Sequence, residues 1–356
     1  MSARRLDASA LRGWAHAAVG DLISHTDEIN RLNVFPVADA DTGTNMLFTM
    51  RSAWAQADAL PDTDDVAQVA AALARGALHG ARGNSGVILS QILRGLADVT
   101  AEAAAERGAV LDDVDGAVLD DVDGAVLASA LRRAVTLVVA SIGQPVPGTI
   151  FTVLRDAANA AEQAVSDGAP LADVLVAVVD AAAVALDKTP GQLTVLAEAG
   201  VVDAGGRGLL VLLDAMRATV TGHSPAREQY VPTPMHTHDR AVAADTPAPP
   251  QFEVMYLLTG CDAGGVDKLR DELDGLGESV AIAAAGADGQ YSVHAHVDDA
   301  GAAVEAGLAV GTPSRIQITS LTGTGGAHPP AGWAHSRAVL SVVDGVGAQE
   351  LFAGEG

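Results

Sequence analysis

Apolar residues recur with a helical period across residues 1–221, and this pattern constrains the fold more than any other feature of the 356-residue chain. Glycine, proline and polar residues interrupt the pattern and divide it into eight segments. The predicted helices lie near residues 7–25, 44–58, 64–78, 85–98, 124–141, 149–166, 170–187 and 205–221. Eight helices joined by short loops are typical of a bundle or helical barrel, and the abundance of small residues suits close helix contacts.

The pattern changes after the last of these helices. Six prolines fall between Thr221 and Gln251, which indicates a linker. Residues 252–321 then follow the order βαββαβ, which is typical of a ferredoxin-like α+β domain. We therefore divide the chain into a helical domain (1–221), a proline-rich linker (222–251), a small α+β domain (252–321) and a final segment (322–356). The final segment, with one strand and one helix start, is expected to be a truncated piece of a C-terminal domain.

Charge and cysteine content exclude several classes of protein. A net charge of −24 argues against a nucleic-acid-binding surface and against docking on anionic lipid. Cys261 is the single cysteine, so no intrachain disulfide can form, and a lone thiol fits a reducing compartment. The first 20 residues contain no apolar core of a signal peptide, and no long apolar stretch escapes a charge or glycine. A cytoplasmic location without membrane insertion is expected.

A short repeat interrupts the helical domain. The octapeptide GAVLDDVD at residues 108–115 recurs letter for letter at residues 116–123. The period is too short for a solenoid, so the repeat is interpreted as a duplication that lengthens a surface loop. An acidic calcium loop is the alternative, but the runs lack the ligand spacing and terminal glutamate of a calcium-binding hand.

The strongest chemical signal is the segment from Asn30 to Met46, NRLNVFPVADADTGTNM. Asp39 and Asp41 are two residues apart, so on an extended loop both carboxylates point to one side. Converging carboxylates with nearby amide and hydroxyl oxygens suit Mg²⁺. Thr42 or Thr44 is expected to cap the helix that follows, whose N-terminus would face phosphate. A simple acidic helix start would explain one aspartate but not the whole run.

Three further helix starts repeat this chemistry. Gly80–Gly86 reads GARGNSG and opens a helix, so backbone amides could approach an anion closely. Gly148 and Thr149 open another helix, and Asp203–Gly206 opens the last one. Each alone would be an ordinary capping turn, but four such starts in one domain predict a rim of helix N-termini around one anionic ligand.

The small domain offers a second group of ligands. His294 and His296 lie two apart on a predicted strand, so both imidazoles face the same side. Cys261 follows the first strand of the same domain, and one thiolate with two imidazoles would suit Zn²⁺. A semi-buried thiol and two ordinary strand histidines are the alternative interpretation.

Four segments together resemble the DhaL-like nucleotide domain of dihydroxyacetone kinases and of the fatty acid kinase ATP-binding subunit. They are Asn33–Met46, Gly80–Gln91, Gly148–Ile150 and AGVVDAGGRGL at 199–209. The wording LNVFP and GARGNSGVILSQ is closest to the fatty acid kinase branch. The resemblance implies an eight-helix barrel that binds Mg-ATP at its rim.

Carried over by position, the resemblance assigns the site residues. Asp39 and Asp41 would hold Mg²⁺, and Lys188 would lie near the phosphates. The residues expected around the nucleotide are Asn33, Thr42, Thr44, Asn45, Gly83, Asn84, Ser85, Gly86, Thr149, Asp203, Gly205 and Gly206. In the small domain the resemblance implies zinc bound by Cys261, His294 and His296. Ala38 and Ala40 depart from the family's proline and glycine, and the loss of that glycine restricts the acidic loop.

The resemblance further implies that the chain is a kinase component that forms acyl phosphate on a fatty acid held by a separate fatty-acid-binding protein. No catalytic base stands out, and a carboxylate acceptor needs none because it is ionised at neutral pH. A kinase subunit for dihydroxyacetone is the alternative enzyme, although such subunits generally end after the helical domain. A non-catalytic nucleotide-binding remnant is the alternative from another class. A homodimer is left open, since no heptad pattern demonstrates one.

Overall fold

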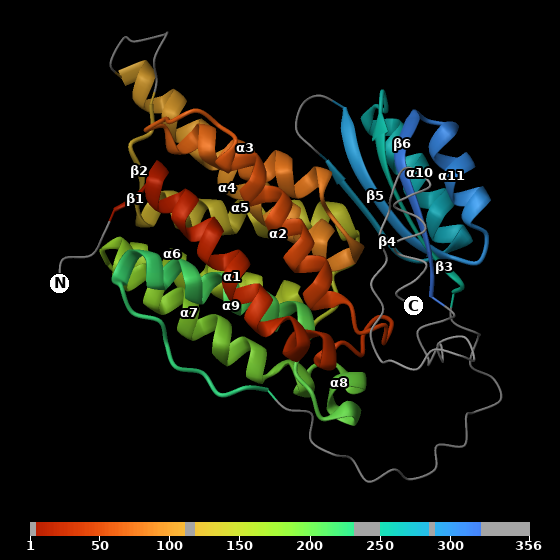
Figure 1. Ribbon diagram of the computed structural model, residues 1–356, viewed down its shortest axis with the longest axis horizontal. Helices are drawn as coiled ribbons and strands as arrows, with labels where there is room; N and C mark the ends of the chain where they lie inside the picture. Colours follow the sequence, from red (N-terminus) through yellow and green to blue (C-terminus); the bar gives the residue numbers. More distant parts are fainter. Residues whose placement is uncertain (1–4, 111–117, 231–249, 285–288, 322–356) are drawn as a thin grey trace, which may run out of the picture. The chain divides into compact units, whose positions relative to one another are not determined.

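The computed structural model describes residues 5–110, 118–230, 250–284 and 289–321. Most of the linker, the middle of the octapeptide repeat and the whole final segment (322–356) lie outside the described residues. The predictions made for those parts therefore have no structural counterpart. Residues up to Leu321 belong to one compact unit, which contains both the helical domain and the small domain (Figure 1).

All eight predicted helices are present in the helical domain. Their bounds are α1 (Ala8–Leu32), α2 (Thr42–Asp58), α3 (Val66–His79), α4 (Gly83–Val110), α5 (Gly124–Ile142), α6 (Ile150–Ser166), α7 (Leu171–Asp187) and α9 (Ala204–Thr221). A short helix, α8 (Thr194–Ala199), and a 3₁₀ turn, η1 (Thr189–Gly191), were not expected. A two-residue pairing of β1 (Leu6–Asp7) with β2 (Asp121–Val122) lies beside the start of α1.

These helices close into a ring. Each of α1 to α7 packs against the next, and α9 packs against both α7 and α1. The core inside the ring is built from alanine, valine and leucine, and small residues allow close crossings. Gly76 in α3 shows how close: a Cβ added there would lie 2.3 Å from the backbone oxygen of Ser52 in α2. The scarcity of aromatic residues is thus explained by tight helix packing.

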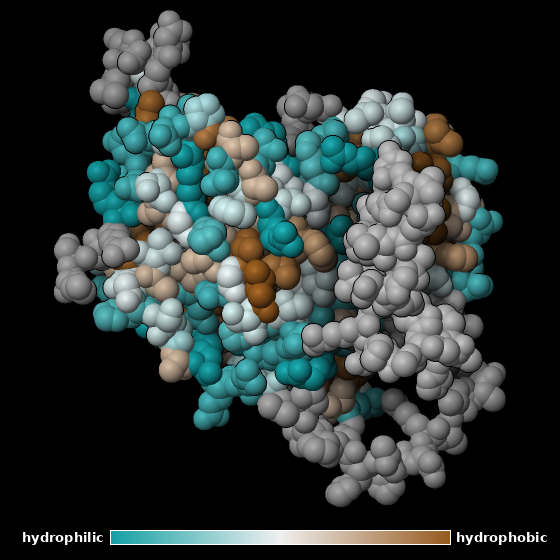
Figure 2. Space-filling view, viewed as in Figure 1, coloured by the Kyte–Doolittle hydropathy of each residue, from teal (hydrophilic) through white to brown (hydrophobic). Residues whose placement is uncertain are grey.

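The outer surface of the ring is mainly polar. Figure 2 shows that the face turned to the viewer is mostly hydrophilic or near neutral over the helical domain, with a small hydrophobic patch over α1 and α2. Among the described residues of this domain, the large apolar side chains that are exposed are Ile23, Val118, Val146 and Val184. Scattered apolar residues of this kind are normal on folded proteins. The high apolar content of the chain is therefore accounted for by the core.

Helix α1 ends seven residues later than predicted, at Leu32, and this extension matters for the site. Asp7 caps its start, where the side chain accepts a hydrogen bond from the amide of Ala10. The apolar stripe continues through Ile29 and Leu32, which are both buried. The polar residues between them, including Asn30, therefore project from a helix rather than from a loop.

Helix α5 is long and apolar enough to span a membrane by length and composition alone. It carries Arg132 and Arg133, which pair with Glu162 of α6 and Asp98 of α4. Its other face packs in the core of the ring, so the composition of α5 is explained as that of a core helix.

The small domain has the expected βαββαβ order. Its elements are β3 (Phe252–Thr259), α10 (Ala263–Leu276), β4 (Gly277–Ala284), β5 (Gln290–Val297), α11 (Ala300–Leu308) and β6 (Thr312–Ser320). The sheet order is β4-β5-β3-β6 with every pair antiparallel, which is the ferredoxin-like arrangement. One face of the sheet packs on α10 and α11 through Val254, Tyr256 and Leu258.

The opposite face of the sheet contacts the helical domain. Met255, Ala281 and Ala283 pack against Leu78 and Val87, which lie at the end of α3 and the start of α4. Two arginines add polar contacts across this boundary. Arg270 of α10 donates to the carbonyl oxygens of Ala140 and Ser141, at the C-terminal end of α5, and Arg94 of α4 donates to Ala284 O. A guanidinium at a helix C-terminus is favourable, because the last carbonyls lack partners within the helix.

Candidate nucleotide and metal site

The acidic loop places two carboxylates beside the N-terminal end of α2. Asn33, the C-cap of α1, donates a hydrogen bond to Asp39. Burial, the charge of Asp39 and a hydrogen bond with it raise the pKa of Asp41 to about 7. Burial also raises the pKa of Asp39. Two carboxylates this close cannot both ionise cheaply unless a cation lies between them, and their oxygens are the ligands that Mg²⁺ prefers.

The start of α2 is capped by a residue from another helix. Oδ1 of Asn30 accepts hydrogen bonds from the amides of Gly43 (2.7 Å) and Thr44 (3.2 Å), and its amide group donates to Thr44 Oγ1. The expectation that Thr42 or Thr44 caps this helix was wrong. These two amides are therefore engaged by α1, and the side chains of Asp41, Thr42 and Asn45 are what the helix start presents to the pocket.

The three other helix starts also reach this pocket. Gly83, at φ +57°, begins α4, and Asn84 and Ser85 follow in its first turn. Thr149 is the N-cap of α6, and its hydroxyl donates to the carbonyl oxygen of Val146. Asp203 is the N-cap of α9 and accepts a hydrogen bond from the amide of Gly206 at 2.7 Å. Burial raises the pKa of Asp203 to about 6, against the lowering effect of bonds from the backbone at Gly206 and Ile150.

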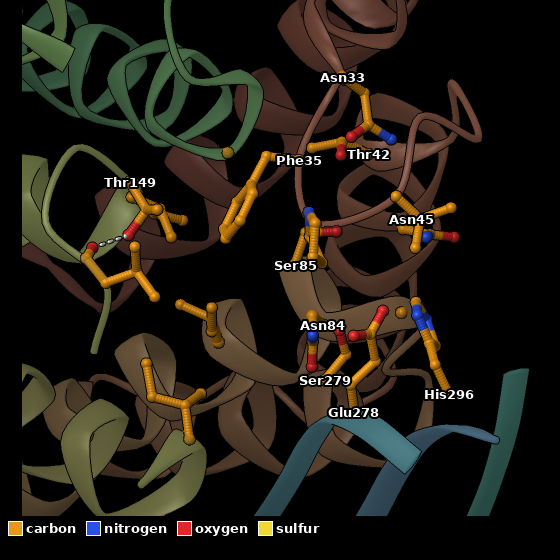
Figure 3. A pocket seen from close by; sticks show the side chains of 18 of the residues that line it. Asn33, Phe35, Thr42, Asn45, Asn84, Ser85, Thr149, Glu278, Ser279 and His296 are labelled. Carbon is orange, nitrogen blue, oxygen red and sulfur yellow. Dashed lines mark hydrogen bonds between the residues drawn. The ribbon is translucent and has the colours of Figure 1, made fainter. Parts of the chain in front are cut away.

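A cavity of about 470 Å³ joins these helix starts. This volume lies in the range of small-molecule and cofactor sites. Predicted residues that line it are Asn33, Asp39, Asp41, Thr42, Asn45, Gly83, Asn84, Ser85, Thr149, Asp203, Gly205 and His296. In Figure 3, Phe35 and Thr149 lie on one side of the cavity, and Asn45, Glu278 and His296 lie on the other. The four helix starts that the sequence singled out are thus gathered around one space.

The cavity has an apolar end that sequence reasoning missed. Phe35, Ile142, Val146 and Ile150 line it, on the side where Thr149 lies. These residues carried no signal, because apolar residues near helix ends are ordinary core residues. An aromatic ring and branched side chains beside helix N-termini offer a place for a flat apolar group next to a place for anions.

Some predicted residues lie off the pocket wall. Thr44, Gly86 and Gly206 are not among the lining residues, although each belongs to a helix start that is. Lys188 is exposed at the C-cap of α7 and does not line the cavity either. Its neighbour Thr189 has the closer connection, since its hydroxyl accepts a hydrogen bond from the amide of Asp203.

The small domain contributes a second cluster through its strand register. Glu253 of β3 lies opposite His296 of β5, and Met255 lies opposite His294. Residues opposite each other in an antiparallel pair share a face, so the carboxylate and both imidazoles meet. One ligand atom from each of Glu253, His294 and His296 lies within 4.8 Å of the others. The charge of Glu253 also raises the pKa of both Asp39 and Asp41, so this cluster adjoins the acidic loop.

The hydrogen bonds of the cluster fit a metal. Nδ1 of His294 lies 3.0 Å from the carbonyl oxygen of Ser279, which can only accept, so Nδ1 carries the proton. In the neutral ring, Nε2 then turns a lone pair toward Glu253 Oε1 at 3.1 Å. A cation between these two acceptors would remove their repulsion, and a ring N–H held by a backbone carbonyl is the usual support of a metal-bound histidine. The carbonyl is aimed by an irregularity in β4, where Ser279 has φ +57°.

His296 adds a second sign of an expected ligand. Its side chain is buried, yet Nδ1 has no hydrogen-bond partner, and the same holds for Asn84 Oδ1. Burial and the neighbouring His294 lower the pKa of His296 to about 4, against the raising effect of Glu253. A neutral imidazole with an unused nitrogen is ready to coordinate a metal. Three protein ligands of the type His, His and carboxylate are known for both zinc and other divalent metals.

Cys261 does not belong to this cluster. It follows the far end of β3, beyond Thr259, which pairs with Gln290, whereas His294 pairs with Met255. Its side chain is part of the core on the helix-covered face, the face opposite the histidines. The structure therefore does not bring together the three residues expected to bind zinc, and Glu253 occupies the third place instead.

The geometry defines a helical phosphate-binding domain combined with a ferredoxin-like domain that carries a candidate metal site. Comparison with protein families agrees with this class. Residues 36–218 match the DAK2 domain, and residues 249–325 match the FakA-like middle domain of fatty acid kinase. The chain therefore belongs to the DAK2-domain family, in its FakA-like branch, and both domains are of kinase-family type.

Curated relatives of the chain are found in Bacillus and Staphylococcus. The chain is 36% identical to Protein YloV of Bacillus subtilis over 233 residues, which cover 65% of this chain and 39% of that protein. It is 28% identical over 309 residues to an uncharacterized protein of Staphylococcus haemolyticus, covering 85% of this chain and 52% of the relative. The chain thus matches only about a third to a half of the length of these relatives.

Proposed function

We propose that the chain is the ATP-dependent component of a kinase that phosphorylates a fatty acid carboxylate presented by a separate fatty-acid-binding protein, in the cytoplasm. The observation that carries the proposal is the convergence of Asp39, Asp41 and four helix N-termini on one cavity. Helix N-termini favour phosphate, and the two carboxylates supply the oxygen ligands of Mg²⁺. The small domain favours a fatty acid over dihydroxyacetone, because its family model is that of a fatty acid kinase component.

The residues of the chain divide the work of phosphoryl transfer. The apolar end around Phe35 and Ile150 would hold the nucleobase, and the starts of α4 and α9 would receive the phosphates. Asp39 and Asp41 would hold Mg²⁺, which neutralises phosphate charge when bound. An oxygen of the ionised acyl carboxylate would form a bond to the γ-phosphorus as the bond to the bridging oxygen of ADP breaks. No proton has to be removed, so no catalytic base is required.

The cluster of Glu253, His294 and His296 faces the same cavity and would hold a divalent metal, with Zn²⁺ the first candidate. Such a metal would supply positive charge close to the reacting oxygens. The charged acceptor needs this help, since Asp39, Asp41, Glu253 and Glu278 make this end of the cavity strongly acidic.

The proposal is tested first by calorimetric titration of Mg-ATP into the unmutated chain and into an Asp39→Asn, Asp41→Asn double variant. Saturable, Mg²⁺-dependent binding is expected, weakened at least about a hundredfold in the variant because both metal ligands lose their charge. Asp65→Asn is the matched control: Asp65 is also a buried aspartate at a helix start, but it caps α3 away from the cavity. A folded, unmutated chain that fails to bind would reject the kinase and favour a remnant without nucleotide.

The second step is the acceptor. Mg-ATP and the chain are mixed with acyl-loaded fatty-acid-binding proteins, and acyl phosphate is trapped with hydroxylamine. Release of ADP with dihydroxyacetone and its binding subunit, but not with the acyl-loaded protein, would replace the proposed substrate by the small ketone. Binding of Mg-ATP without turnover in either assay would leave the chain as a nucleotide-binding module.

A further inference from the structure

A buried ion pair lies directly beneath the cavity and has no place in the chemistry described above. Arg207 and Glu28 are each only 2% exposed. The arginine donates from Nε to Glu28 Oε1 at 2.8 Å and from Nη2 to Oε2 at 3.2 Å. Burying two charges costs desolvation free energy that their attraction barely offsets, so such a pair is weak evidence for a stabilising role. A different reason for its presence is therefore needed.

The pair joins the two helix ends that carry opposite parts of the site. Arg207 lies in the first turn of α9, after Asp203 and Gly205, which line the cavity. Glu28 lies in the last turns of α1, two residues before Asn30 and five before Asn33. Through Asn30 the end of α1 holds the start of α2, and through Asn33 it holds Asp39. A bidentate pair fixes both distance and orientation between its two helices.

The segment that follows α9 completes this arrangement. The amide of Tyr230 donates to Glu28 Oε1 at 3.1 Å, and the Tyr230 hydroxyl donates to Asp187 at the end of α7. The Tyr230 ring lies 5.6 Å from the Arg207 guanidinium carbon and partly covers it. Arg227 secures the segment by a bidentate bond to Asp214 of α9. Residues 223–230, expected to belong to a linker, thus hold the end of the helical domain together.

The oxygens of Glu28 are fully used by these contacts. His25 Nδ1 lies 2.8 Å from Glu28 Oε2 and donates to it when it carries the proton. With that proton in place, the 3.2 Å contact between His25 Nδ1 and Arg207 joins two donors and is not a hydrogen bond. Burial alone would raise the pKa of Glu28, but the bonds from Arg207, His25 and Tyr230 lower it. The carboxylate is therefore ionised and held from three elements.

We propose that Arg207 and Glu28 are positioning residues for the nucleotide site, and that Tyr230 locks them in place from the segment after α9. The pair sets the start of α9, with Asp203, against the end of α1, with Asn30 and Asn33. The consequence for ATP rests on the proposed function, but the geometric role does not. Neither charge touches the cavity, so both act through the residues that line it.

The experiment compares Arg207→Met, Glu28→Gln and Tyr230→Ala with the unmutated chain. Tyr230 lies outside the helical core, so its variant tests the proposal even if a core variant does not fold. Leu127→Ala is the stability control, because Leu127 is a buried residue near the start of α5, whereas the opposite end of α5, at Ile142, lines the cavity. Amide hydrogen exchange is measured without nucleotide, and Mg-ATP affinity by calorimetry, at a temperature where all variants are folded.

We expect faster exchange confined to residues 33–45 and 203–206, and a Kd for Mg-ATP about tenfold weaker in the two core variants, the size of effect seen when residues that orient metal ligands are changed. Tyr230→Ala is expected to show the same pattern more weakly, and Leu127→Ala to leave the Kd unchanged. Unchanged exchange at both segments, or exchange raised uniformly as in Leu127→Ala, would overturn the positioning role. Failure of the unmutated chain to bind Mg-ATP would count against the proposed function instead, and the exchange result would still decide the role of the pair.

Discussion

The acidic loop of the helical domain and the histidine cluster of the small domain are built in opposite ways. Asp39 and Asp41 lie within one short loop, and the residue that bonds Asp39 is only six positions away. Glu253 is 41 and 43 residues from His294 and His296, and strand pairing brings them together. A local site is encoded by adjacent letters, whereas the cluster depends on the register of two strands and on which face of the sheet is left open.

This difference explains why one metal site was predicted with its residues and the other was not. The H-x-H pair is local to β5, so its two histidines were found correctly. The third ligand comes from another strand, and its identity depends on a register that changes face with each single-residue shift. Cys261 had the right chemistry and the right domain, but it lies on the wrong face of the sheet.

The largest expected effect tests this register directly. Glu253→Gln should lose most of the metal retained by the small domain, more than about a hundredfold in affinity, since even changes behind the ligands cost about 10–100-fold. Cys261→Ser should retain it. Elemental analysis after gel filtration, with metal added and excess removed, measures both. Metal lost from Cys261→Ser but kept by Glu253→Gln would restore the original assignment.

The next effect concerns the local site and its dependence on pH. Asp203 has a folded pKa of about 6, above the ordinary value of 3.8 for an aspartate, so the folded state binds the extra proton between these values. Stability must then fall as pH rises through this window, by about 3 kcal/mol in total, of which about 1.4 kcal/mol lies between pH 5 and 7.5. Asp203→Asn keeps a helix-capping side chain and removes the titration.

Chemical denaturation at pH 5 and pH 7.5 measures this difference. The stability of Asp203→Asn relative to the unmutated chain should rise between the two pH values. Asp65→Asn, at another buried helix start, provides the comparison. Parallel pH profiles for Asp203→Asn and the unmutated chain would show that Asp203 does not titrate in this window.

A smaller effect is expected from the glycine that opens α4. Gly83→Ala puts a side chain at φ +57° and places its Cβ 2.4 Å from Asn45 Nδ2, so Asn45 must move. We expect Mg-ATP binding about tenfold weaker, equivalent to about 1.4 kcal/mol. Gly168→Ala has a similar positive φ with nothing within 4 Å, so it carries the same backbone strain without disturbing the cavity. Equal ATP affinities in both variants would argue against a role for this close approach.

The smallest effect concerns the departure from the family in the acidic loop. Ala40, where relatives usually carry glycine, has φ +56°, a conformation that costs a residue with a Cβ about 1 kcal/mol. Ala40→Gly removes this strain but also loosens the unfolded chain, so a net stabilisation of about 0.5 kcal/mol or less is expected. Thermal unfolding with and without Mg²⁺ measures it. A clear loss of stability would show that the alanine is well accommodated.

Much of the fold follows from local patterns. The eight main helices were predicted because each carries its own apolar stripe, and several carry their own capping residue, as Asp7, Asp123 and Asp203 do. The order of the small domain was predicted because its strands alternate and its helices do not. The extension of α1 and the short α8 were missed, since helix ends and single turns depend on packing more than on composition.

The sequence by itself determined the elements, the acidic loop and the histidine pair, because each is specified by residues within a few positions of one another. Only the tertiary structure decided which residues meet across long distances. Asn30 of α1 caps α2, Glu253 joins the histidines, and Arg207 finds Glu28 across 179 residues of chain. The physical reason is the same in each case: these contacts depend on how helices close into a ring and how strands align. Many arrangements of the same elements would satisfy the local patterns equally well, and packing selects one of them.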